Sequence, residues 1–239
     1  MTMQERVAAV IVAAGSSRRM EGRDKLWIPL AGRITLARAI DVFEASPLID
    51  SIVLVLNAER IADAEALCKQ EGWSKIASIV TGGSRRQDSV RIGLDMLAQL
   101  VPQCAWVMIH DGARPLVTPA ILEAGLRTAQ QHGAAIAGVP VKDTIKQLRE
   151  GLVRTTLDRS QLWSVQTPQV FSFPLIYAAH HALAAGQDVT DDAALLERLG
   201  QPVAIFSGAY TNIKITTQED LLIAEALLQQ RDAIDLGAP

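Results

Sequence analysis

The chain has 239 residues, of which 49% are apolar and only 4% are aromatic, and its formal net charge is −3. This length can bury a sizeable core, and the apolar fraction excludes an intrinsically disordered chain. The mildly acidic balance argues against a general nucleic-acid binder, which needs a basic stripe to neutralise phosphates. The scarcity of aromatic side chains argues against a platform that stacks single-stranded bases.

The cysteines and the first apolar run bear on the compartment. Cys68 and Cys104 lie too far apart for a C-x-x-C site, so we expect buried or partly buried thiols. The histidines show no zinc-ligand spacing. The apolar run at 7–14 is too short to span a bilayer, and Glu5 beside Arg6 does not make a basic leader. We therefore expect a soluble cytoplasmic protein without a membrane contact.

Short β-branched runs alternate with amphipathic segments over the first 140 residues. Strands are predicted at 7–12, 51–56, 76–80, 105–109 and 134–139. Helices are predicted at 34–45, 58–70, 88–100 and 119–131. This alternation is typical of βαβ units and indicates an α/β fold: a Rossmann-like, mostly parallel sheet with helices on both faces.

The alternation breaks between about residues 140 and 162. Residues 141–148 and 152–157 alternate roughly between polar and apolar around a turn at 149–151, which predicts an inserted β-hairpin. An isolated hairpin is marginal in water, so this arm is expected to pack on another surface, such as a second subunit. The α/β pattern then resumes with helices at 173–185, 191–199 and 218–230 and strands at 203–206 and 212–215. We predict one domain, residues 1–239, that carries an arm.

Ligands bind beyond the carboxyl ends of the strands in open α/β sheets, so the loops there are the candidate sites. After the first strand, the small residues Ala13, Ala14 and Gly15 allow a ligand to approach the backbone. The positive charges of residues 18, 19, 23 and 25 follow within eight positions. This loop suits a polyphosphate but matches neither a Walker A motif nor a G-x-G-x-x-G fingerprint. A solvated basic turn is the alternative.

Two further loops carry glycine or acidic residues. Gly82 and Gly83 permit close approach, and Asp88 or Ser89 is expected to cap the next helix; a plain capped loop is the alternative. Asp111 follows a central strand, where it suits a metal or a sugar hydroxyl.

Two basic residues, Arg114 and Lys214, belong to the same candidate site. Arg114 could instead form a structural ion pair with Asp111, which is the alternative to a ligand role for Asp111. Lys214 lies on a predicted apolar strand, with a surface lysine as the alternative.

The loops contain no G-x-S-x-G motif and no Cys/His pair, and His110 is interpreted as structural. A phosphate monoester has a second pKa near 6, so at neutral pH it brings its own attacking oxygen. Such a reaction needs cations and a metal to position two anions and stabilise spreading charge. Clustered Arg and Lys at strand ends fit that requirement.

In combination, these blocks closely resemble the 2-C-methyl-D-erythritol 4-phosphate cytidylyltransferase family. The matching blocks are 12–20 with Lys25, 82–83 with 86–89, 110–115, 140–146, 158–159 with 162–163, 167–169, 190–191 and 212–214. They follow one another in order over nearly the whole chain. The resemblance implies synthesis of CDP-methylerythritol and pyrophosphate from CTP and methylerythritol phosphate, with Mg²⁺, in non-mevalonate isoprenoid biosynthesis. It also implies a homodimer joined by a β-arm.

The resemblance also assigns roles to individual residues. Those implied to contact CTP are Ala13, Ala14, Gly15, Gly83, Ser89 and Asp111. Those implied to be catalytic are Arg19 and Lys25, which stabilise the transition state, and Arg159 and Lys214, which position the acceptor. The remaining acceptor contacts are implied to be Arg114, Thr144, Thr167 and Thr190. Because Thr144 and Arg159 lie in or beside the arm, they are candidates to serve the neighbouring subunit's site.

The chain departs from many family members at four positions. Proline is common where Val12 and Asp24 stand, and aspartate where Ser84 and Thr211 stand.

Two alternative functions remain open at this point. One is ribitol-5-phosphate cytidylyltransferase, which shares the fold and the CTP loops. The other is a non-catalytic nucleotide-binding relative, which would not need Arg19 and Lys25, so the presence of both residues counts against it.

Overall fold

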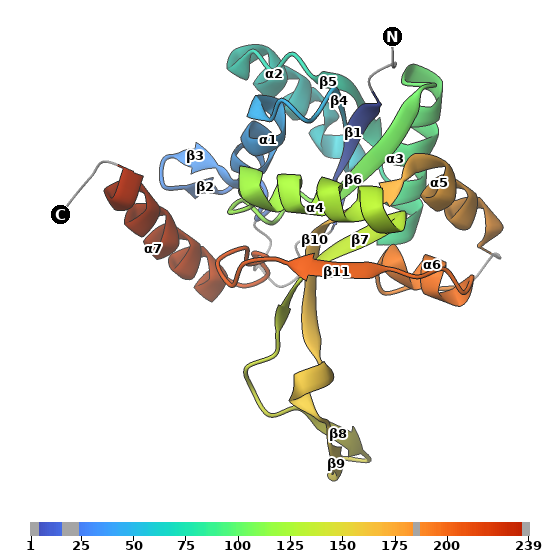
Figure 1. Cartoon of the computed structure of the whole chain (residues 1–239). Coiled ribbons are helices and arrows are strands. Elements are labelled where there is room, and N and C mark those ends of the chain that lie inside the picture. The colour runs from blue at the N-terminus through green and yellow to red at the C-terminus, as the bar shows by residue number, and fades with distance from the viewer. Residues whose placement is uncertain (1–4, 16–23, 184–186, 236–239) are drawn as a thin grey trace.

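The computed structural model describes residues 5–15, 24–183 and 187–235. Its centre is a seven-stranded sheet in the order β11-β7-β10-β6-β1-β4-β5 (Figure 1). The strands are β1 (Arg6–Ala13), β4 (Ser51–Leu56), β5 (Ile76–Thr81), β6 (Cys104–Asp111), β7 (Ala134–Pro140), β10 (Trp163–Ser172) and β11 (Ala204–Ser207). All pairs are parallel except those of β10, which runs antiparallel to β6 and β7.

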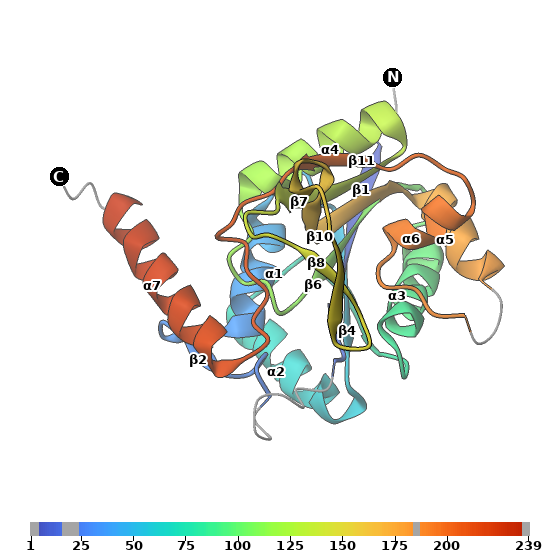
Figure 2. The ribbon, with the colours of Figure 1, turned by 90° about the horizontal axis from the view of Figure 1, so that it is seen from below.

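Helices cover both faces of this sheet (Figures 1 and 2). On one face lie α1 (Thr35–Ala45), α2 (Ile61–Glu71) and α4 (Pro119–His132); on the other lie α3 (Arg86–Leu100), α5 (Phe173–Ala182) and α6 (Ala193–Arg198). Strand β1 explains the two cores, since Ala9 and Ile11 pack on the first side and Ala8 and Val10 on the second. A strand covered on both faces needs apolar residues at every position. The predicted α/β class is confirmed.

The C-terminal helix α7 (Gln218–Asp235) lies beside the sheet and projects from the body of the molecule. It packs through Ala224 and Leu228 on Leu30 and Ile215. Leu30 belongs to a short hairpin of β2 (Pro29–Leu30) and β3 (Arg33–Ile34). In the described part of the chain, no helix combines the length and apolar character needed to cross a membrane.

The inserted arm is present as a hairpin that extends away from the sheet (Figure 1). Its strands are β8 (Lys146–Arg149) and β9 (Leu152–Thr156). Glu150 and Gly151 both have positive φ angles, 53° and 80°, as the twist of a two-residue hairpin turn requires. A single-turn helix, η2 (Arg159–Gln161), leads back into β10. The arm exposes Leu152 and Val153 to solvent, at 76% and 60% of their full area.

Some predicted elements were wrong or missed. Residues 212–215 form no strand: this segment is an extended loop whose Ile215 amide donates to the Ala113 carbonyl instead of pairing in the sheet. Strand β10 was not predicted, because Gln166, Thr167 and Pro168 interrupt its apolar pattern. The predicted helix 58–70 divides into a single turn, η1 (Ala58–Arg60), and α2.

Candidate active site

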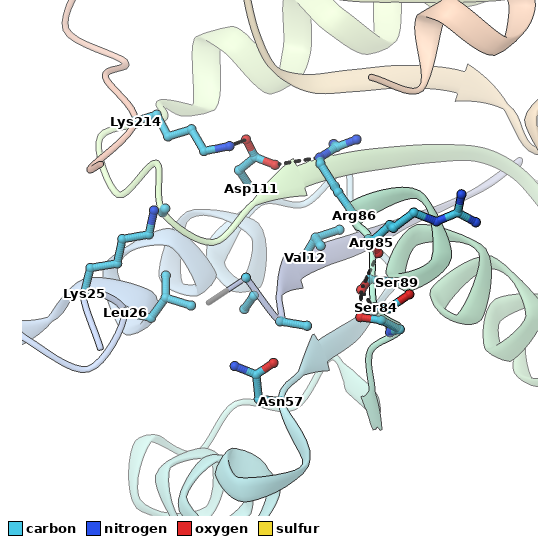
Figure 3. A pocket seen from close by; sticks show the side chains of 15 residues that line it. Val12, Lys25, Leu26, Asn57, Ser84, Arg85, Arg86, Ser89, Asp111 and Lys214 are labelled. Carbon is cyan, nitrogen blue, oxygen red and sulfur yellow. Dashed lines mark hydrogen bonds and ion pairs between the residues drawn. The ribbon is translucent and has the colours of Figure 1, made fainter. Parts of the chain in front are cut away.

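The carboxyl ends of β1, β5 and β6 open into one cavity of about 540 Å³ (Figure 3). Its lining contains most of the residues predicted from the strand-end loops, together with Lys214 from the loop before α7. The lining residues are Val12, Ala13, Ala14, Gly15, Lys25, Leu26, Asn57, Gly83, Ser84, Arg85, Arg86, Ser89, Asp111, Ala113 and Lys214. The structure thus brings together segments that lie as far apart in the chain as Val12 and Lys214.

The loops after β1 and β5 are in close contact because of Gly82. A Cβ atom at this position would meet the side chain of Ala14 and lie 2.7 Å from Ser89 Oγ. The Gly82 amide donates to the Leu56 carbonyl at 2.8 Å, and the Gly83 amide donates to Ser89 Oγ at 3.1 Å. Ser89 therefore fixes the glycine loop from the first turns of α3.

Helix α3 begins two residues before its predicted start, at Arg86, and Asp88 caps it. The carboxylate of Asp88 accepts from the Arg85 amide at 3.2 Å and from the Arg85 guanidinium at 2.8–2.9 Å. These bonds lower the pKa of Asp88 to about 2. The helix start beside the cavity is therefore held by an ionised carboxylate at neutral pH.

Asp111 ends β6 and lies where three cations meet. Its Oδ1 accepts from Arg86 Nε at 3.2 Å and its Oδ2 from Lys214 Nζ at 2.8 Å, whereas Arg114 Nε is 3.9 Å from Oδ2. Burial opposes ionisation, but the charges of Arg86 and Lys214 and the bond from Lys214 outweigh it and hold the pKa of Asp111 far below its usual range. The Asp111–Arg114 ion pair, which the sequence offered as the alternative to a ligand role, is the longest of the three contacts. Arg114 Nη1 donates instead to the Asn212 carbonyl at 2.8 Å.

His110 supports this strand end from within the core. The ring is fully buried, which lowers its pKa to about 4 and keeps it neutral. Its Nε2 lies 3.2 Å from the Arg114 carbonyl, which can only accept, so Nδ1 is the nitrogen that accepts from the Thr167 hydroxyl at 3.0 Å. The same hydroxyl accepts from the Asp111 amide at 3.0 Å. The donor of Thr167 is thus used inside the protein, and His110 has a structural place.

A second cavity of about 340 Å³ adjoins the first. The two share Arg86, Asp111 and Lys214. The rest of its lining is Arg114, Val165, Gln166, Thr167, Gln169, Thr190 and Asp191. The predicted residues Arg114, Thr167 and Thr190 therefore lie together with Lys214, on the β10 side of Asp111. Three cations outnumber the two carboxylates, Asp111 and Asp191, and together with the neutral hydrogen-bonding groups they suit a small phosphorylated molecule.

Lys25 lies in the wall of the first cavity, at the end of its loop (Figure 3). Its neighbour Asp24 accepts from the Leu26 amide at 3.2 Å and from Arg60 Nε at 3.2 Å. The Arg60 guanidinium also lies over the Trp27 ring, 5.2 Å from its centre. Arg60 thus offsets the negative charge that Asp24 places beside Lys25.

Two predicted residues lie away from these cavities. Thr144 and Arg159 are exposed on the arm, where Arg159 Nη1 donates to the Lys142 carbonyl at 2.9 Å, and neither lines either cavity. Arg19 lies outside the described residues.

Sequence reasoning did not single out Arg86, which lines both cavities. Its signals in the sequence were a place in the family-matching block 86–89 and a position soon after a glycine-rich loop, at a helix start.

The carboxylates of the described residues do not make a metal cage. No group of three or more His, Cys, Asp or Glu side chains with metal-binding geometry occurs within residues 5–15, 24–183 and 187–235. Asp111 is the acidic side chain among the described lining of the larger cavity, and it is ionised. Magnesium in nucleotide sites is commonly held by one or two carboxylates plus substrate phosphates and water, and a single carboxylate fits that pattern.

A family model of 2-C-methyl-D-erythritol 4-phosphate cytidylyltransferase matches residues 7–230. The chain belongs to this family. A relative of that name from Dehalococcoides mccartyi (strain CBDB1) is 52% identical and covers 96% of this chain and 99% of its own length. Another, from Geobacter metallireducens, is 42% identical over 94% of this chain and 98% of its own.

A solved structure agrees with this assignment. The 4-diphosphocytidyl-2C-methyl-D-erythritol synthase of Anaerococcus prevotii DSM 20548 has a TM-score of 0.83 and 33% identity, covering 94% of this chain and 99% of its own. The resemblance found in the sequence is confirmed, and the chain is a nucleotidyltransferase of isoprenoid biosynthesis. Nothing in these matches supports the ribitol-5-phosphate or the non-catalytic alternative.

Proposed function

We propose that the enzyme transfers CMP from CTP to 2-C-methyl-D-erythritol 4-phosphate at the two adjoining cavities. An oxygen of the acceptor phosphate attacks the α-phosphorus of CTP. A new P–O bond forms, the bond from the α-phosphorus to the bridging oxygen of the β-phosphate breaks, and pyrophosphate leaves with the electron pair. The observation that carries this proposal is the convergence of family-matching residues from four distant segments on one cavity.

The larger cavity is the proposed CTP site. Ala13, Ala14 and Gly15 offer a backbone without bulky side chains at the end of β1, where consecutive amides suit phosphate oxygens. Gly83 and Ser89 are the proposed contacts of the cytosine, and Asp111 is the proposed contact of the ribose or of oxygens on the metal side. The volume of about 540 Å³ suits a nucleotide.

The smaller cavity is the proposed acceptor site. Lys214 lies at the boundary between the cavities, where it can hold the acceptor phosphate against the α-phosphorus. Arg114 and Thr190 are its proposed partners there. The Thr167 hydroxyl donates to His110, so its proposed part is to accept a hydrogen bond from the acceptor while it holds the Asp111 amide.

Charge stabilisation is assigned to Arg19 and Lys25 at the α-phosphorus. No general base is needed, since the acceptor phosphate is ionised at neutral pH. The neutral, buried His110 agrees with a mechanism that moves no proton at this point. Arg159 and Thr144 are proposed to reach the acceptor of the neighbouring subunit, because they lie on the arm, away from both cavities of their own chain.

A divalent cation, Mg²⁺ in the simplest case, is the proposed cofactor. When bound, it neutralises phosphate charge and stabilises the departing pyrophosphate. Asp111 is the described residue best placed to face it, and the nucleotide phosphates would supply further oxygen ligands.

The test is pyrophosphate release by the purified enzyme with CTP, Mg²⁺ and one of two acceptors. We expect release with methylerythritol phosphate, little with ribitol 5-phosphate, and loss of activity when EDTA removes the metal. Release with ribitol 5-phosphate alone would assign the other acceptor. Absence of release with both, while CTP still binds, would refute the proposed catalytic function.

A further inference from the structure

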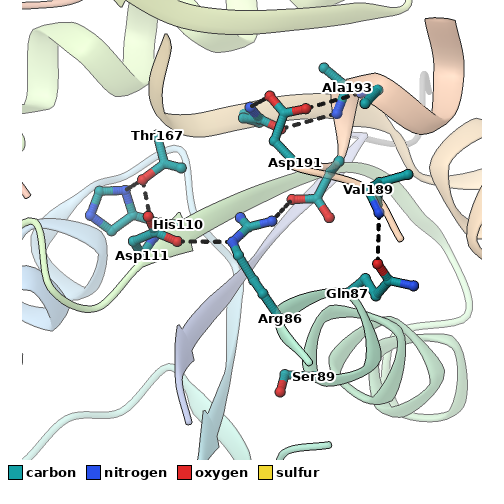
Figure 4. Close-up of polar contacts among 12 residues, drawn as sticks. Arg86, Gln87, Ser89, His110, Asp111, Thr167, Val189, Asp191 and Ala193 are labelled. Carbon is teal, nitrogen blue, oxygen red and sulfur yellow. Dashed lines mark hydrogen bonds and ion pairs between the residues drawn. The ribbon is translucent and has the colours of Figure 1, made fainter. Parts of the chain in front are cut away.

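Arg86 is the first residue of α3, and its side chain reaches the wall between the two cavities (Figures 3 and 4). It also lines a third hollow, of about 360 Å³, on the side of α6. The sequence resemblance gives Arg86 no role. It lies between the proposed CTP site and the proposed acceptor site, so its contacts can affect both sites.

The guanidinium of Arg86 bridges two carboxylates from distant parts of the chain. Its Nε donates to Asp111 Oδ1 at 3.2 Å, and its Nη1 donates to Asp192 Oδ2 at 2.7 Å. The Asp192 side chain is fully buried directly before α6, and its other oxygen lies 3.2 Å from Nε2 of the fully buried His180. Burial and the contact with His180 fix the position of the Asp192 carboxylate. Arg86 bonds to this carboxylate and to Asp111, so it holds Asp111 at a fixed distance from Asp192.

The connection continues from Asp111 to Lys214. While Oδ1 of Asp111 holds Arg86, Oδ2 accepts from Lys214 Nζ at 2.8 Å. Lys214 is 41% exposed on an extended loop, so this bond is a principal restraint on where its ammonium group lies. Asp192, Arg86, Asp111 and Lys214 therefore form one continuous chain of ion pairs from the buried start of α6 to the acceptor cavity.

Asp192 is also connected to the opposite wall of the acceptor cavity, through Thr190. Thr190 lines that cavity and lies two residues before Asp192. The planar fork of an arginine can donate to two carboxylates at once in a fixed geometry, which a lysine ammonium on a flexible stem cannot reproduce. Arg86 thereby sets the separation between the Thr190 wall and the Asp111–Lys214 wall.

We propose that Arg86, held by Asp192, is a positioning residue that orients Lys214 through Asp111 for capture of the acceptor phosphate. The inference rests on the proposed cytidylyltransfer and deepens it. It assigns the pair Arg86–Asp192 to the acceptor side of the reaction. It predicts that the two residues act as one unit, although neither needs to touch substrate.

The test compares the variants R86K, D192N and R86K/D192N with the wild type and with R91Q. Arg91 lies on the same helix, is exposed and has only a 3.9 Å pairing with Asp95, so R91Q is a matched control. Pyrophosphate release gives kcat and KM for each substrate, calorimetry gives the Kd for CTP without acceptor, and thermal unfolding verifies folding. D192N retains the guanidinium and the Asp111 pair, so it remains informative if R86K does not fold.

We expect each single substitution to lower kcat/KM for methylerythritol phosphate at least tenfold, while the Kd for CTP changes less than threefold in D192N. The double variant should be no worse than the poorer single variant, as for residues of one connected unit.

Values for R86K and D192N within twofold of R91Q would overturn the proposal, and so would a double variant whose loss equals the product of the single losses. A wild-type enzyme that makes no product would instead refute the proposed function, which separates the two failures.

Discussion

At the scale of single residues, Asp111 organises the site. One ionised carboxylate contacts Arg86 and Lys214 and lies near Arg114, so the surroundings of Asp111 carry a net positive charge although the whole chain carries −3. The charges of these three cations are therefore partly compensated before substrate binds. A phosphate that arrives there can take over donors that are already aimed at an anion.

His110 provides a residue-scale test through pH. Its folded pKa is about 4 against an ordinary value of 6.5, because burial disfavours the charged ring. Between these values the unfolded chain binds a proton that the folded protein does not. The contribution of His110 to the free energy of unfolding is therefore fully present above pH 6.5. It falls by about 3 kcal/mol in total as the pH decreases toward 4.

The measurement is the free energy of unfolding by urea at several values between pH 7 and pH 4 for the wild type, His110→Gln and His132→Gln. The His110 variant should lose less stability over this range than the wild type. His132 is exposed, so its variant should follow the wild-type curve. If the free energy of unfolding changed equally with pH in all three proteins, His110 would bind its proton as readily in the folded state as in the unfolded state. That result would contradict the lowered pKa.

At the scale of elements, the loop between β11 and α7 carries Lys214, and its conformation depends on Asn212. This side chain is fully buried and donates to the Thr167 carbonyl at 2.9 Å and to Gln166 Oε1 at 3.2 Å. The Asn212 carbonyl in turn accepts from Arg114 at 2.8 Å. The apolar residues Ile213 and Ile215 predicted a strand here, but side-chain bonds from a buried asparagine hold the loop instead.

Asn212→Ala should cost about 1–3 kcal/mol of stability, because it removes the side-chain donor of the buried Thr167 carbonyl and one of the two donors to Gln166 Oε1. It should also lower kcat/KM for the acceptor about tenfold or more, because Lys214 loses its rigid support. Urea unfolding and pyrophosphate release measure the two effects. Thr211→Ala changes the exposed neighbour and should leave both quantities near the wild-type values; an Asn212 variant that matches it would exclude this role.

Strand β10 shows what local sequence patterns cannot predict. The buried polar residues Gln166, Thr167 and Gln169 make it read as a loop, yet they bond to groups far away in sequence. Gln169, for example, donates to Asp191 at 2.7 Å. Only the tertiary fold supplies those partners, so a strand with an apolar face of its own, such as β1, is predictable and β10 is not.

At the scale of the whole molecule, the parallel topology and most of the strand-end site followed from the sequence. The glycines and cations of the loops after β1, β5 and β6 meet because the carboxyl ends of parallel strands lie at one edge of a sheet. The Arg86–Asp192 pair did not follow, since 106 positions separate its residues and no local signal joins them. The arm was predicted as a hairpin, and its partner stays a prediction.

A mixing experiment tests whether the arm serves the neighbouring subunit. Subunits with Arg159→Ala and subunits with Lys214→Gln should each be nearly inactive. If Arg159 acts across a dimer, each mixed dimer holds one intact site of two. Random exchange should then restore about a quarter of wild-type activity. Sedimentation should show dimers at micromolar concentration, as the exposed Leu152 and Val153 suggest. No regained activity in demonstrably mixed dimers would place Arg159 in its own subunit's site.

The central claim is that cations from distant segments act together on the transfer of CMP to methylerythritol phosphate. The most direct measurement is acceptor-dependent pyrophosphate release from CTP by the wild type and by Lys214→Gln, with CTP affinity measured separately. The wild type should release pyrophosphate only when methylerythritol phosphate is present. The variant should bind CTP normally but react about 100- to 1000-fold more slowly, the usual loss when one charged contact to a reacting group is removed. A wild type without acceptor-dependent release, or a variant as fast as the wild type, would contradict the account.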